Sequence, residues 1–352
     1  MTTILLKIDP TNPDIEKVEL AAGVIRRGGL VAFPTETVYG LGANAVDETA
    51  VKKIFAAKGR PPDNPIIVHI AEKEDIHLLA EEVPEIATPL IQRFWPGPLT
   101  LILPRSEAVP KAVTAGLETV AVRMPSHPIS HLLIKKAEVP VAAPSANLSG
   151  RPSPTTAQHV VEDLWGRVDI IIDGGEITHG IESTVLDVTS TPPVLLRPGP
   201  ISVEELKEVV GEVMVHPVAE ARVDEEEAVA RSPGMKYRHY APAAEVVVVE
   251  GEISKVVEKI QQLVDLKKIN GKKTAVIATA ETADLYRADE IRVLGRREDL
   301  RSIAKNLFGA LRALDAAGVS FIAVEGIEAK GIGLAIMNRL RKAAGGQIIT
   351  VS

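Results

Sequence analysis

The sequence of 352 residues contains no cysteine, and aromatic residues make up only 3% of it. The absence of cysteine excludes disulfide bonds, thiolate zinc sites and a cysteine nucleophile. With so few aromatic side chains the core must consist of Val, Ile, Leu and Ala, which favours helices layered on aliphatic strands. The chain also lacks an apolar run of about 18 residues, so no membrane span is expected. The polar start MTTILLKIDP does not resemble a signal peptide, and we expect a cytoplasmic protein.

Acidic residues outnumber basic ones and give a net charge of -7. This balance argues against a general nucleic-acid-binding surface, which would be basic, but it leaves room for a local basic pocket. Hydrophobic residues form 45% of the chain and charged residues 25%, as in folded globular proteins. The length predicts two domains.

The first region, to about residue 199, combines closely spaced strands with a few helices. Residues 14–27 have helical spacing of apolar side chains and end at Gly28 and Gly29. Several predicted strands follow one another without a helix, which indicates a large mixed sheet. These strands are LVAFP, IIVHI, LTLIL, TVAVRMP, VPVAAPSAN, DIIID, STVLDV and VLLRP, and the stretch PTETVYGLGAN is predicted to be a loop.

The last region alternates regularly between strands and helices. Five strands are predicted at EVVVVEG, TAVIATA, IRVLG, SFIAVEG and QIITV, with four helices between them. Such alternation predicts a small Rossmann-like, doubly wound parallel sheet. We therefore expect a first domain over residues 1–205, a linker or lid over 206–243 and a second domain over 244–352.

The familiar short motifs for nucleotide and metal binding are missing. No Walker A pattern occurs, and no G-x-G-x-x-G follows a strand. The eight histidines show no H-E-x-x-H or other metal-ligand spacing, so no dedicated metal site is predicted.

Polar side chains nevertheless gather in the first region. Thr35 comes directly after a buried strand, where open α/β sheets bind ligands, although a hydrogen-bonded turn would explain it equally well. Lys58 and Arg60 lie between a helix end and two prolines, which order the loop that carries them, with Asn64 and His69 following. A lysine at a helix C-terminus can also simply complement the helix dipole.

Further hydroxyls, amides and cations follow other predicted strands. Three polar residues lie on a loop that follows an apolar strand: Ser145, Asn147 and Ser153. Ser183 is at the start of the predicted strand STVLDV, and Arg197 is near the end of VLLRP. These groups can donate hydrogen bonds to phosphate or ribose oxygens. Together they form a set of phosphate-binding residues without a P-loop.

Arg123 stands in a strand that is otherwise apolar. A buried arginine must meet a carboxylate or an anionic ligand, because an unpaired buried charge is very costly. The sequence leaves two partners for Arg123 open: a carboxylate of the protein, in a structural ion pair, or a bound anionic ligand.

These segments resemble one known family in their order and content. FPTETVYGLG, KGRPPDNPIIVHI, PGPLTLIL, VAVRMP, APSANLSG, IESTVLDV and LLRPGPI look like the YrdC-like domain of L-threonylcarbamoyl-AMP synthases. The last region and the connector SPGMKYRHYAP resemble the longer, two-domain form of that family. The resemblance therefore spans nearly the whole chain.

The resemblance implies an enzyme, a nucleotidyltransferase that makes threonylcarbamoyl-AMP and pyrophosphate from L-threonine, bicarbonate (or CO2) and ATP. Mg²⁺ would arrive with ATP, and a separate transferase complex would pass the product to tRNA. Direct tRNA binding is left open. The resemblance implies that the phosphates are bound and oriented by Lys58, Arg60, Ser145 and Asn147. It implies that the rest of the nucleotide is bound by Asn64, Thr119, Ser153 and Arg197. It implies that threonine is bound by Thr35, His69, Arg123, Ala143 and Ser183.

The connector SPGMKYRHYAP carries two tyrosines, a lysine, an arginine and a histidine between a Pro-Gly turn and an Ala-Pro stop. An inert interdomain linker is one interpretation. Its place after a complete nucleotide-binding domain favours a lid that keeps water from a labile mixed anhydride, with Tyr237 as the expected contact to ATP.

Two other functions fit the fold less well. A non-catalytic RNA-binding module would require a basic surface or an RNP-type aromatic pattern, and the sequence has neither. A carbamoyltransferase that uses a YrdC-like domain would carry acylphosphatase and zinc-finger modules, which are absent from this sequence.

Overall fold

The computed structural model describes residues 2–221 and 240–352 and divides into two compact units. The first unit comprises the described residues up to His216, except Gly150–Pro152. The second comprises Gly150–Pro152, the short helix α9 (Pro217–Glu220) and the chain from Tyr240 onward. Connector residues 232–239, including Tyr237, lie outside the described residues.

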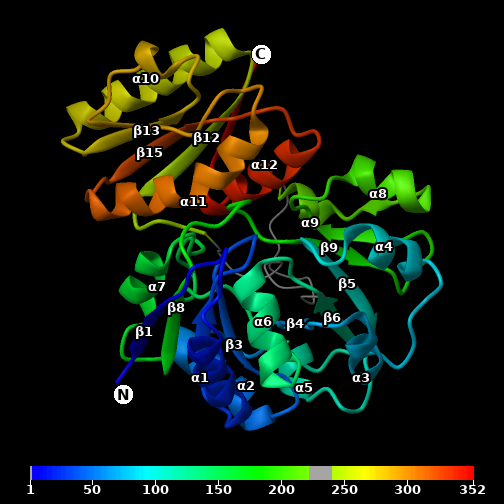
Figure 1. Cartoon of the computed structure of the whole chain (residues 1–352). Helices are drawn as coiled ribbons and strands as arrows, with labels where there is room; N and C mark the ends of the chain where they lie inside the picture. Colours follow the sequence, from blue (N-terminus) through cyan, green and yellow to red (C-terminus); the bar gives the residue numbers. More distant parts are fainter. Residues whose placement is uncertain (1, 222–239) are drawn as a thin grey trace. The chain divides into compact units, whose positions relative to one another are not determined.

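The first unit is built on a mixed sheet of eleven strands (Figure 1). Its spatial order is β1-β8-β2-β3-β7-β4-β6-β5-β9-β10-β11, with parallel and antiparallel pairs. The strands are β1 (Ile4–Lys7), β2 (Val31–Phe33), β3 (Gly40–Asn44), β4 (Ile67–His69), β5 (Leu99–Pro104), β6 (Thr119–Arg123), β7 (Val141–Ala142), β8 (Ile170–Asp173), β9 (Thr184–Asp187), β10 (Val194–Arg197) and β11 (Met214–Val215).

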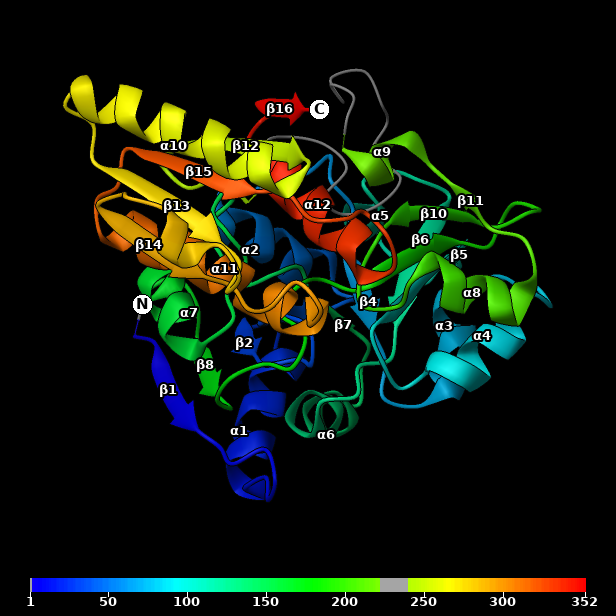
Figure 2. The same cartoon turned by 90° about the horizontal axis from the view of Figure 1, so that it is seen from above.

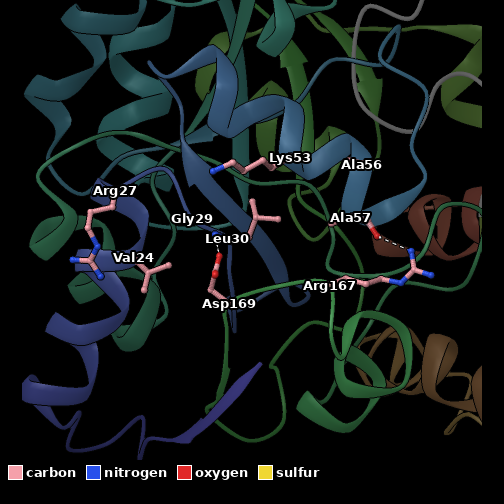
Figure 3. A pocket seen from close by; sticks show the side chains of 9 residues that line it. All are labelled: Val24, Arg27, Gly29, Leu30, Lys53, Ala56, Ala57, Arg167 and Asp169. Carbon is pink, nitrogen blue, oxygen red and sulfur yellow. Dashed lines mark hydrogen bonds between the residues drawn. The ribbon is translucent and has the colours of Figure 1, made fainter. Parts of the chain in front are cut away.

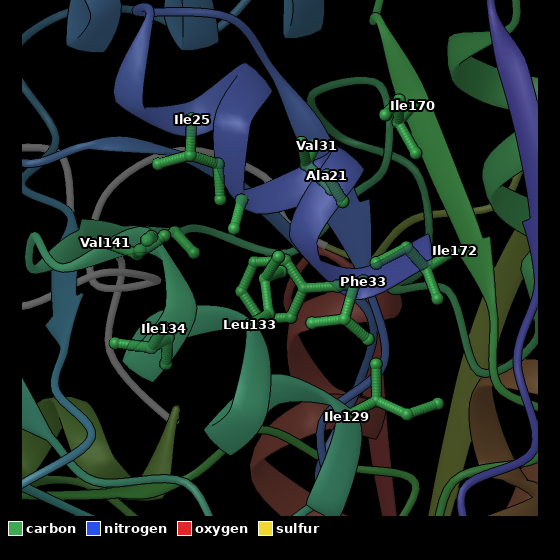
Figure 4. Close-up of a cluster of buried hydrophobic side chains, with 14 of the residues drawn as sticks. Ala21, Ile25, Val31, Phe33, Ile129, Leu133, Ile134, Val141, Ile170 and Ile172 are labelled. Carbon is green, nitrogen blue, oxygen red and sulfur yellow. The ribbon is translucent and has the colours of Figure 1, made fainter. Parts of the chain in front are cut away.

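Helices connect these strands and cover the sheet. They are α1 (Ile15–Arg26), α2 (Glu48–Lys58), the 3₁₀ turn η1 (Lys73–Asp75), α3 (Ile76–Leu79), α4 (Ala87–Phe94), α5 (Lys111–Thr114), α6 (Pro128–Ala137), α7 (Ala157–Leu164) and α8 (Val203–Val210). Helices α1 and α6 lie side by side (Figure 2). Their apolar faces form one buried cluster with β2, β7 and β8, shown in Figure 4.

Helix α1 illustrates how the sequence sets this core. Val18, Ala22 and Ile25 recur at helical spacing and are fully buried, so one face of the helix meets the sheet. Asp14 caps the first turn by accepting hydrogen bonds from the backbone amides of Glu16 and Lys17. The Asp14 cap therefore sets where the helix begins, and the apolar spacing sets which face it buries.

The second unit contains a five-stranded parallel sheet in the order β14-β13-β15-β12-β16. Its elements are β12 (Glu245–Gly251), α10 (Ile253–Ile269), β13 (Thr274–Ala278), the 3₁₀ turn η2 (Ala283–Leu285), β14 (Glu290–Val293), α11 (Leu300–Ala316), β15 (Phe321–Glu325), α12 (Ile332–Ala343) and β16 (Ile348–Val351). Helix α10 covers one face of this sheet, and α11 and α12 cover the other (Figure 1).

The predicted fold class, a mixed-sheet domain followed by a parallel α/β domain, is confirmed. Three strands differ from expectation, one of them the edge strand β11 (Met214–Val215), which lies in the predicted linker. The predicted loop PTETVYGLGAN ends in strand β3, and the N-terminal residues Ile4–Lys7 add the edge strand β1. Within residues 2–221 and 240–352, no helix combines the length and the apolar character needed to span a bilayer.

A buried carboxylate organises the carboxyl edge of the second sheet. Glu325, the last residue of β15, is 3% exposed. It accepts hydrogen bonds from the amide and hydroxyl of Thr279 at 2.9 and 2.8 Å and from the Tyr286 hydroxyl at 2.6 Å. Burial, and then the bond to Glu325, raises the pKa of Tyr286, which therefore stays a donor. This carboxylate ties the segment after β13 to β15.

Replacing Glu325 with alanine should lower the free energy of unfolding by about 3 kcal/mol, because several buried donors lose their acceptor. Glu328→Ala, which changes an exposed carboxylate in the loop after β15, should have little effect. Urea unfolding of the full chain and amide exchange at Thr279 measure the difference. Equal stability of the two variants would contradict the structural role of Glu325.

Candidate active site

The loop after β2 carries the first group of site residues. The Thr35 hydroxyl donates to the Val38 carbonyl at 2.6 Å and lies 2.8 Å from the Thr37 hydroxyl. The expected turn is therefore present. It is also attached at two points to the segment between β7 and α7, because the Tyr39 amide donates to the Pro154 carbonyl and the Tyr39 carbonyl accepts from the Ala146 amide.

Arg123 at the end of β6 is 3% exposed and forms an ion pair with Glu36. Its Nη2 donates to Glu36 Oε1 at 2.6 Å, its Nη1 to the Thr37 hydroxyl at 3.0 Å and its Nε to the Gly97 carbonyl at 3.2 Å. Of the two partners that the sequence left open, the structure shows the protein carboxylate. The ion pair fastens the loop after β2 to β6.

His69 on β4 is the register partner of Arg123 and is 3% exposed. Burial, and then the charge of Arg123, lowers the pKa of His69 to about 3. Its buried Nδ1 has no hydrogen-bond partner among the residues that the structure describes. A neutral imidazole with an uncommitted nitrogen is thus available beside the arginine.

Ser183 extends this group across β5. Its hydroxyl lies 2.8 Å from that of Thr100, which is the β5 register partner of Arg123. Arg197 at the end of β10 donates to the Ser183 carbonyl and hydroxyl, both at 3.0 Å. A Cβ at Gly199 would lie 2.3 Å from the Thr184 amide nitrogen, so only glycine permits this close approach of the two strand ends.

Lys58 is the last residue of α2 and only 2% exposed. Asp47 caps the start of this helix, and Gly59, with φ +61°, ends it in the left-handed conformation that favours glycine. The Lys58 ammonium donates to the Ser145 carbonyl and, at 2.6 Å, to the Asn147 carbonyl. Dipole complementarity alone does not explain this contact with a second loop.

Arg60 and Asn64 belong to the loop before β4, where Arg60 Nη2 donates to the carbonyls of Asn64 and Pro65 at 3.2 and 3.0 Å. The buried Oδ1 of Asn64 has no partner among the described residues. Because Ile67 pairs with Ala121 in a parallel ladder, Pro65 is level with Thr119. Thr119 is thus at the start of β6, about 13 Å from Arg123 at 3.3 Å per residue.

The remaining expected residues connect these groups. The Ala143 amide donates to the carbonyl of Ile67, the first residue of β4, at 2.9 Å, and Gly40 bridges to Ser145. The Ser153 hydroxyl donates to Glu182, which is buried beside Ser183. The predicted contact of Tyr237 with ATP falls outside the described residues and stays a prediction from the sequence.

Tyr240, the other connector tyrosine, belongs to the second unit. It is 5% exposed, and its ring centroid lies 5.1 Å from that of Phe308 on α11. This tyrosine therefore packs into the second unit as an anchor.

Several residues that hold the site are missing from the expected set. Glu36 and Thr37 hold Arg123, Thr100 holds Ser183, and Glu182 holds Ser153. The sequence carries a signal for one of them, because a buried arginine requires a carboxylate, but that signal does not select Glu36 among the acidic residues.

The site thus has two ends joined by one loop. Arg123, His69 and Ser183 form one end at the carboxyl termini of β4 and β6, and the segments around Lys58 and Asn64 form the other. Among the described residues, no group of three or more His, Asp and Glu could hold a metal ion. Fold and site define a two-domain α/β protein whose first domain suits one ligand with a carboxylate and another with phosphates.

Comparisons with known proteins agree with this class. Residues 23–199 match the family model described as Telomere recombination, and residues 201–345 match that of the threonylcarbamoyl-AMP synthase C-terminal domain. The threonylcarbamoyl-AMP synthase of Pyrococcus abyssi is 58% identical and covers 95% of this chain and 96% of its own. That of Bacillus subtilis is 49% identical, covering 97% and 96%.

Solved structures give the same result. The crystal structure of P. abyssi Sua5 complexed with L-threonine has a TM-score of 0.93 at 55% identity and covers 100% of both chains. E. coli YciO has a TM-score of 0.51 at 27% identity and covers 56% of this chain and 96% of its own. The chain belongs to the threonylcarbamoyl-AMP synthase family, as the sequence resemblance indicated, and it is an enzyme, a transferase.

The pKa of His69 generates a pH prediction. The folded state keeps this imidazole neutral down to about pH 3, whereas the unfolded chain protonates it near the ordinary histidine pKa of 6.5. The unfolded state therefore binds more protons below pH 6.5, and stability falls as the pH falls. Between about pH 6 and pH 4, the free energy of unfolding of the wild type should fall relative to His69→Asn by about 1.4 kcal/mol per pH unit.

Urea unfolding at several pH values measures this slope. His77→Asn is the control, because His77 is exposed. A constant difference between the wild type and His69→Asn at every pH would contradict the lowered pKa.

Proposed function

We propose that this chain condenses L-threonine, bicarbonate (or CO2) and ATP to threonylcarbamoyl-AMP and pyrophosphate. The observation that carries this proposal is the single loop, Thr35–Tyr39, that touches both ends of the site. One substrate at each end would be held against the same rigid segment, and positioning is most of what such a reaction requires. The relative from P. abyssi whose structure contains L-threonine supports the assignment of the amino-acid substrate.

The Arg123 end suits the carboxylate of threonine. A guanidinium has five N–H donors, and three of those of Arg123 are used by Gly97, Thr37 and Glu36. One N–H on each Nη nitrogen has no acceptor among the described residues, which matches the two oxygens of a carboxylate. We assign threonine to this end, with Thr35, His69, Ala143 and Ser183 around its amine and side chain.

The Lys58 end suits the phosphates of ATP. Lys58 and Arg60 supply positive charge, and Ser145 and Asn147 lie on the loop that the Lys58 ammonium holds. Thr119 begins β6 and is level with Pro65, the residue after Asn64 in the loop before β4. We assign these residues to the nucleotide, with Ser153 and Arg197 as further contacts.

The reaction needs no protein nucleophile. The threonine amine forms a C–N bond to the carbon of bicarbonate, a C–O bond of bicarbonate breaks, and water leaves to give a carbamate. A carbamate oxygen then forms a bond to the α-phosphorus of ATP while the bond from that phosphorus to the oxygen that bridges it to the β-phosphorus breaks. Pyrophosphate leaves with the bonding electron pair. The chain's role is to orient the carbamate and to neutralise charge on the phosphates with Lys58 and Arg60.

We further propose that Mg²⁺ enters bound to ATP, since phosphate oxygens and water are the ligands it prefers. The product would then serve a separate transferase complex that modifies tRNA in the cytoplasm.

Lys58→Ala and Arg60→Ala should each reduce pyrophosphate release by about 100-fold or more, because charge stabilisation at the transferring phosphorus is lost. The measurement is pyrophosphate release from ATP with threonine and bicarbonate each omitted in turn. Lys52→Ala, an exposed change on the same helix, is the matched control and should keep its activity. Wild-type turnover in both variants would remove the phosphate assignment.

Arg123→Lys should raise the KM for threonine by about tenfold or more and change the KM for ATP little, because lysine keeps the charge and loses the fork of donors. Steady-state kinetics with each substrate varied separately test this split, and circular dichroism checks folding. An equal rise in both KM values would contradict the assignment of Arg123 to threonine.

A further inference from the structure

A pocket of about 480 Å³ lies in the first unit away from the residues assigned above. It is formed by the end of α1, one side of α2 and the turn between α7 and β8 (Figure 3). Leu30 and Asp169 directly precede β2 and β8, so the pocket lies at the amino end of β2, and the Thr35–Tyr39 loop follows its carboxyl end. The volume is within the range of small-molecule sites.

Three cations from three separate elements line this pocket: Arg27 at the end of α1, Lys53 on α2 and Arg167 before β8. Arg27 and Arg167 lie on opposite sides of it, with Leu30 and Lys53 between them (Figure 3). The one carboxylate in the lining, Asp169, is committed to the Leu30 amide at 2.8 Å.

The charge of these cations is not neutralised within the described residues, where none of the three forms an ion pair. Their sequence neighbours behave differently. Arg26 pairs with Glu19 at 2.5 Å, and Lys52 pairs with Glu48 at 2.7 Å. Lys53 instead donates to the Gly28 carbonyl at 2.6 Å, and Arg167 lies 3.4 Å from the Ala57 carbonyl. Weak neutral acceptors leave these cations available to an anion.

The walls between the cations are apolar. Val24, Leu30, Ala56 and Ala57 supply them, and Gly29 adds no side chain. A Cβ at Gly29 would lie 2.5 Å from Val24 Cγ1, so a larger residue there would have to displace Val24. Cations separated by an apolar floor suit an organic ligand with more than one anionic group better than a bare ion.

We propose that this pocket binds a small phosphorylated ligand of the nucleoside diphosphate class, at a site separate from the active site. Arg27 and Arg167 would hold anionic groups at the two sides, Lys53 would add charge between them, and the apolar floor would contact the organic part. Arg167 contacts the carbonyl of Ala57, the residue before Lys58, so an occupied pocket would act on the helix end that carries Lys58.

The test is calorimetric titration of the full chain with ADP and, separately, with inorganic pyrophosphate. The wild type should show a binding event in addition to that of the active site. Lys53→Gln/Arg167→Gln should weaken this event by about tenfold or more, since two charged contacts are lost. Lys52→Gln/Arg93→Gln removes the same charge outside the pocket and should retain it.

Ala56→Phe distinguishes binding inside the pocket from non-specific electrostatic binding at the surface, because the phenyl ring fills the pocket while every cation is kept. Ala56 is exposed on α2, so the helix can carry the larger side chain, and thermal unfolding checks each variant. The proposal predicts that Ala56→Phe loses the ADP event. Retention of that event in Ala56→Phe, or identical isotherms for the wild type and Lys53→Gln/Arg167→Gln, would overturn it. ADP affinity no greater than that of pyrophosphate would overturn the assignment of a nucleoside.

Discussion

The buried ion pair between Arg123 and Glu36 is the interaction on which the rest of the active site depends. It joins residues 87 positions apart and attaches the loop after β2 to the end of β6. Withdrawing two charges from water is costly, and an apolar pair of similar size would be as stable or more so. The pair is therefore better explained by orientation than by stability. Glu36 and Thr37 fix the guanidinium plane, so its remaining N–H groups point in set directions before any ligand arrives.

Backbone hydrogen bonds extend this order to the whole loop. The carbonyls of Glu36 and Thr37 accept from the amides of His179 and Gly180, and the amide and carbonyl of Tyr39 bond to Pro154 and Ala146. Because these groups are already committed, the loop cannot move one end of the site without moving the other. Such preorganisation lowers the entropy that substrate binding must overcome.

Local signals in the sequence predicted much of this architecture. Asp47 and Gly59 delimit α2, so the position of Lys58 at a helix end was predictable, and strand alternation predicted the parallel sheet of the second unit. Strand β3 was missed because its glycines indicate a loop. Gly42 faces Phe33, whose ring leaves no space for a Cβ, and that packing is invisible in the sequence.

Long-range pairing set the other limit. The sequence required a partner for Arg123 and could not select Glu36, since their contact depends on the path of the three strands β3, β7 and β4, which lie between β2 and β6 in the sheet. Nothing in the sequence indicated that the three cations of the 480 Å³ pocket would lie together. Arg27, Lys53 and Arg167 each resemble solvated surface residues, and only the fold brings them to one cavity.

Helix α2 shows how one element can serve two sites without merging them. Lys53, Ala56 and Ala57 are spaced i, i+3 and i+4, so they share the face that lines the pocket. Lys58 is five residues after Lys53, which turns it by about 140° around the helix axis, toward Ser145 and Asn147. The two sites therefore share a rigid helix and no side chain. Any influence of one on the other must pass through the last turn of α2, where Arg167 meets the Ala57 carbonyl.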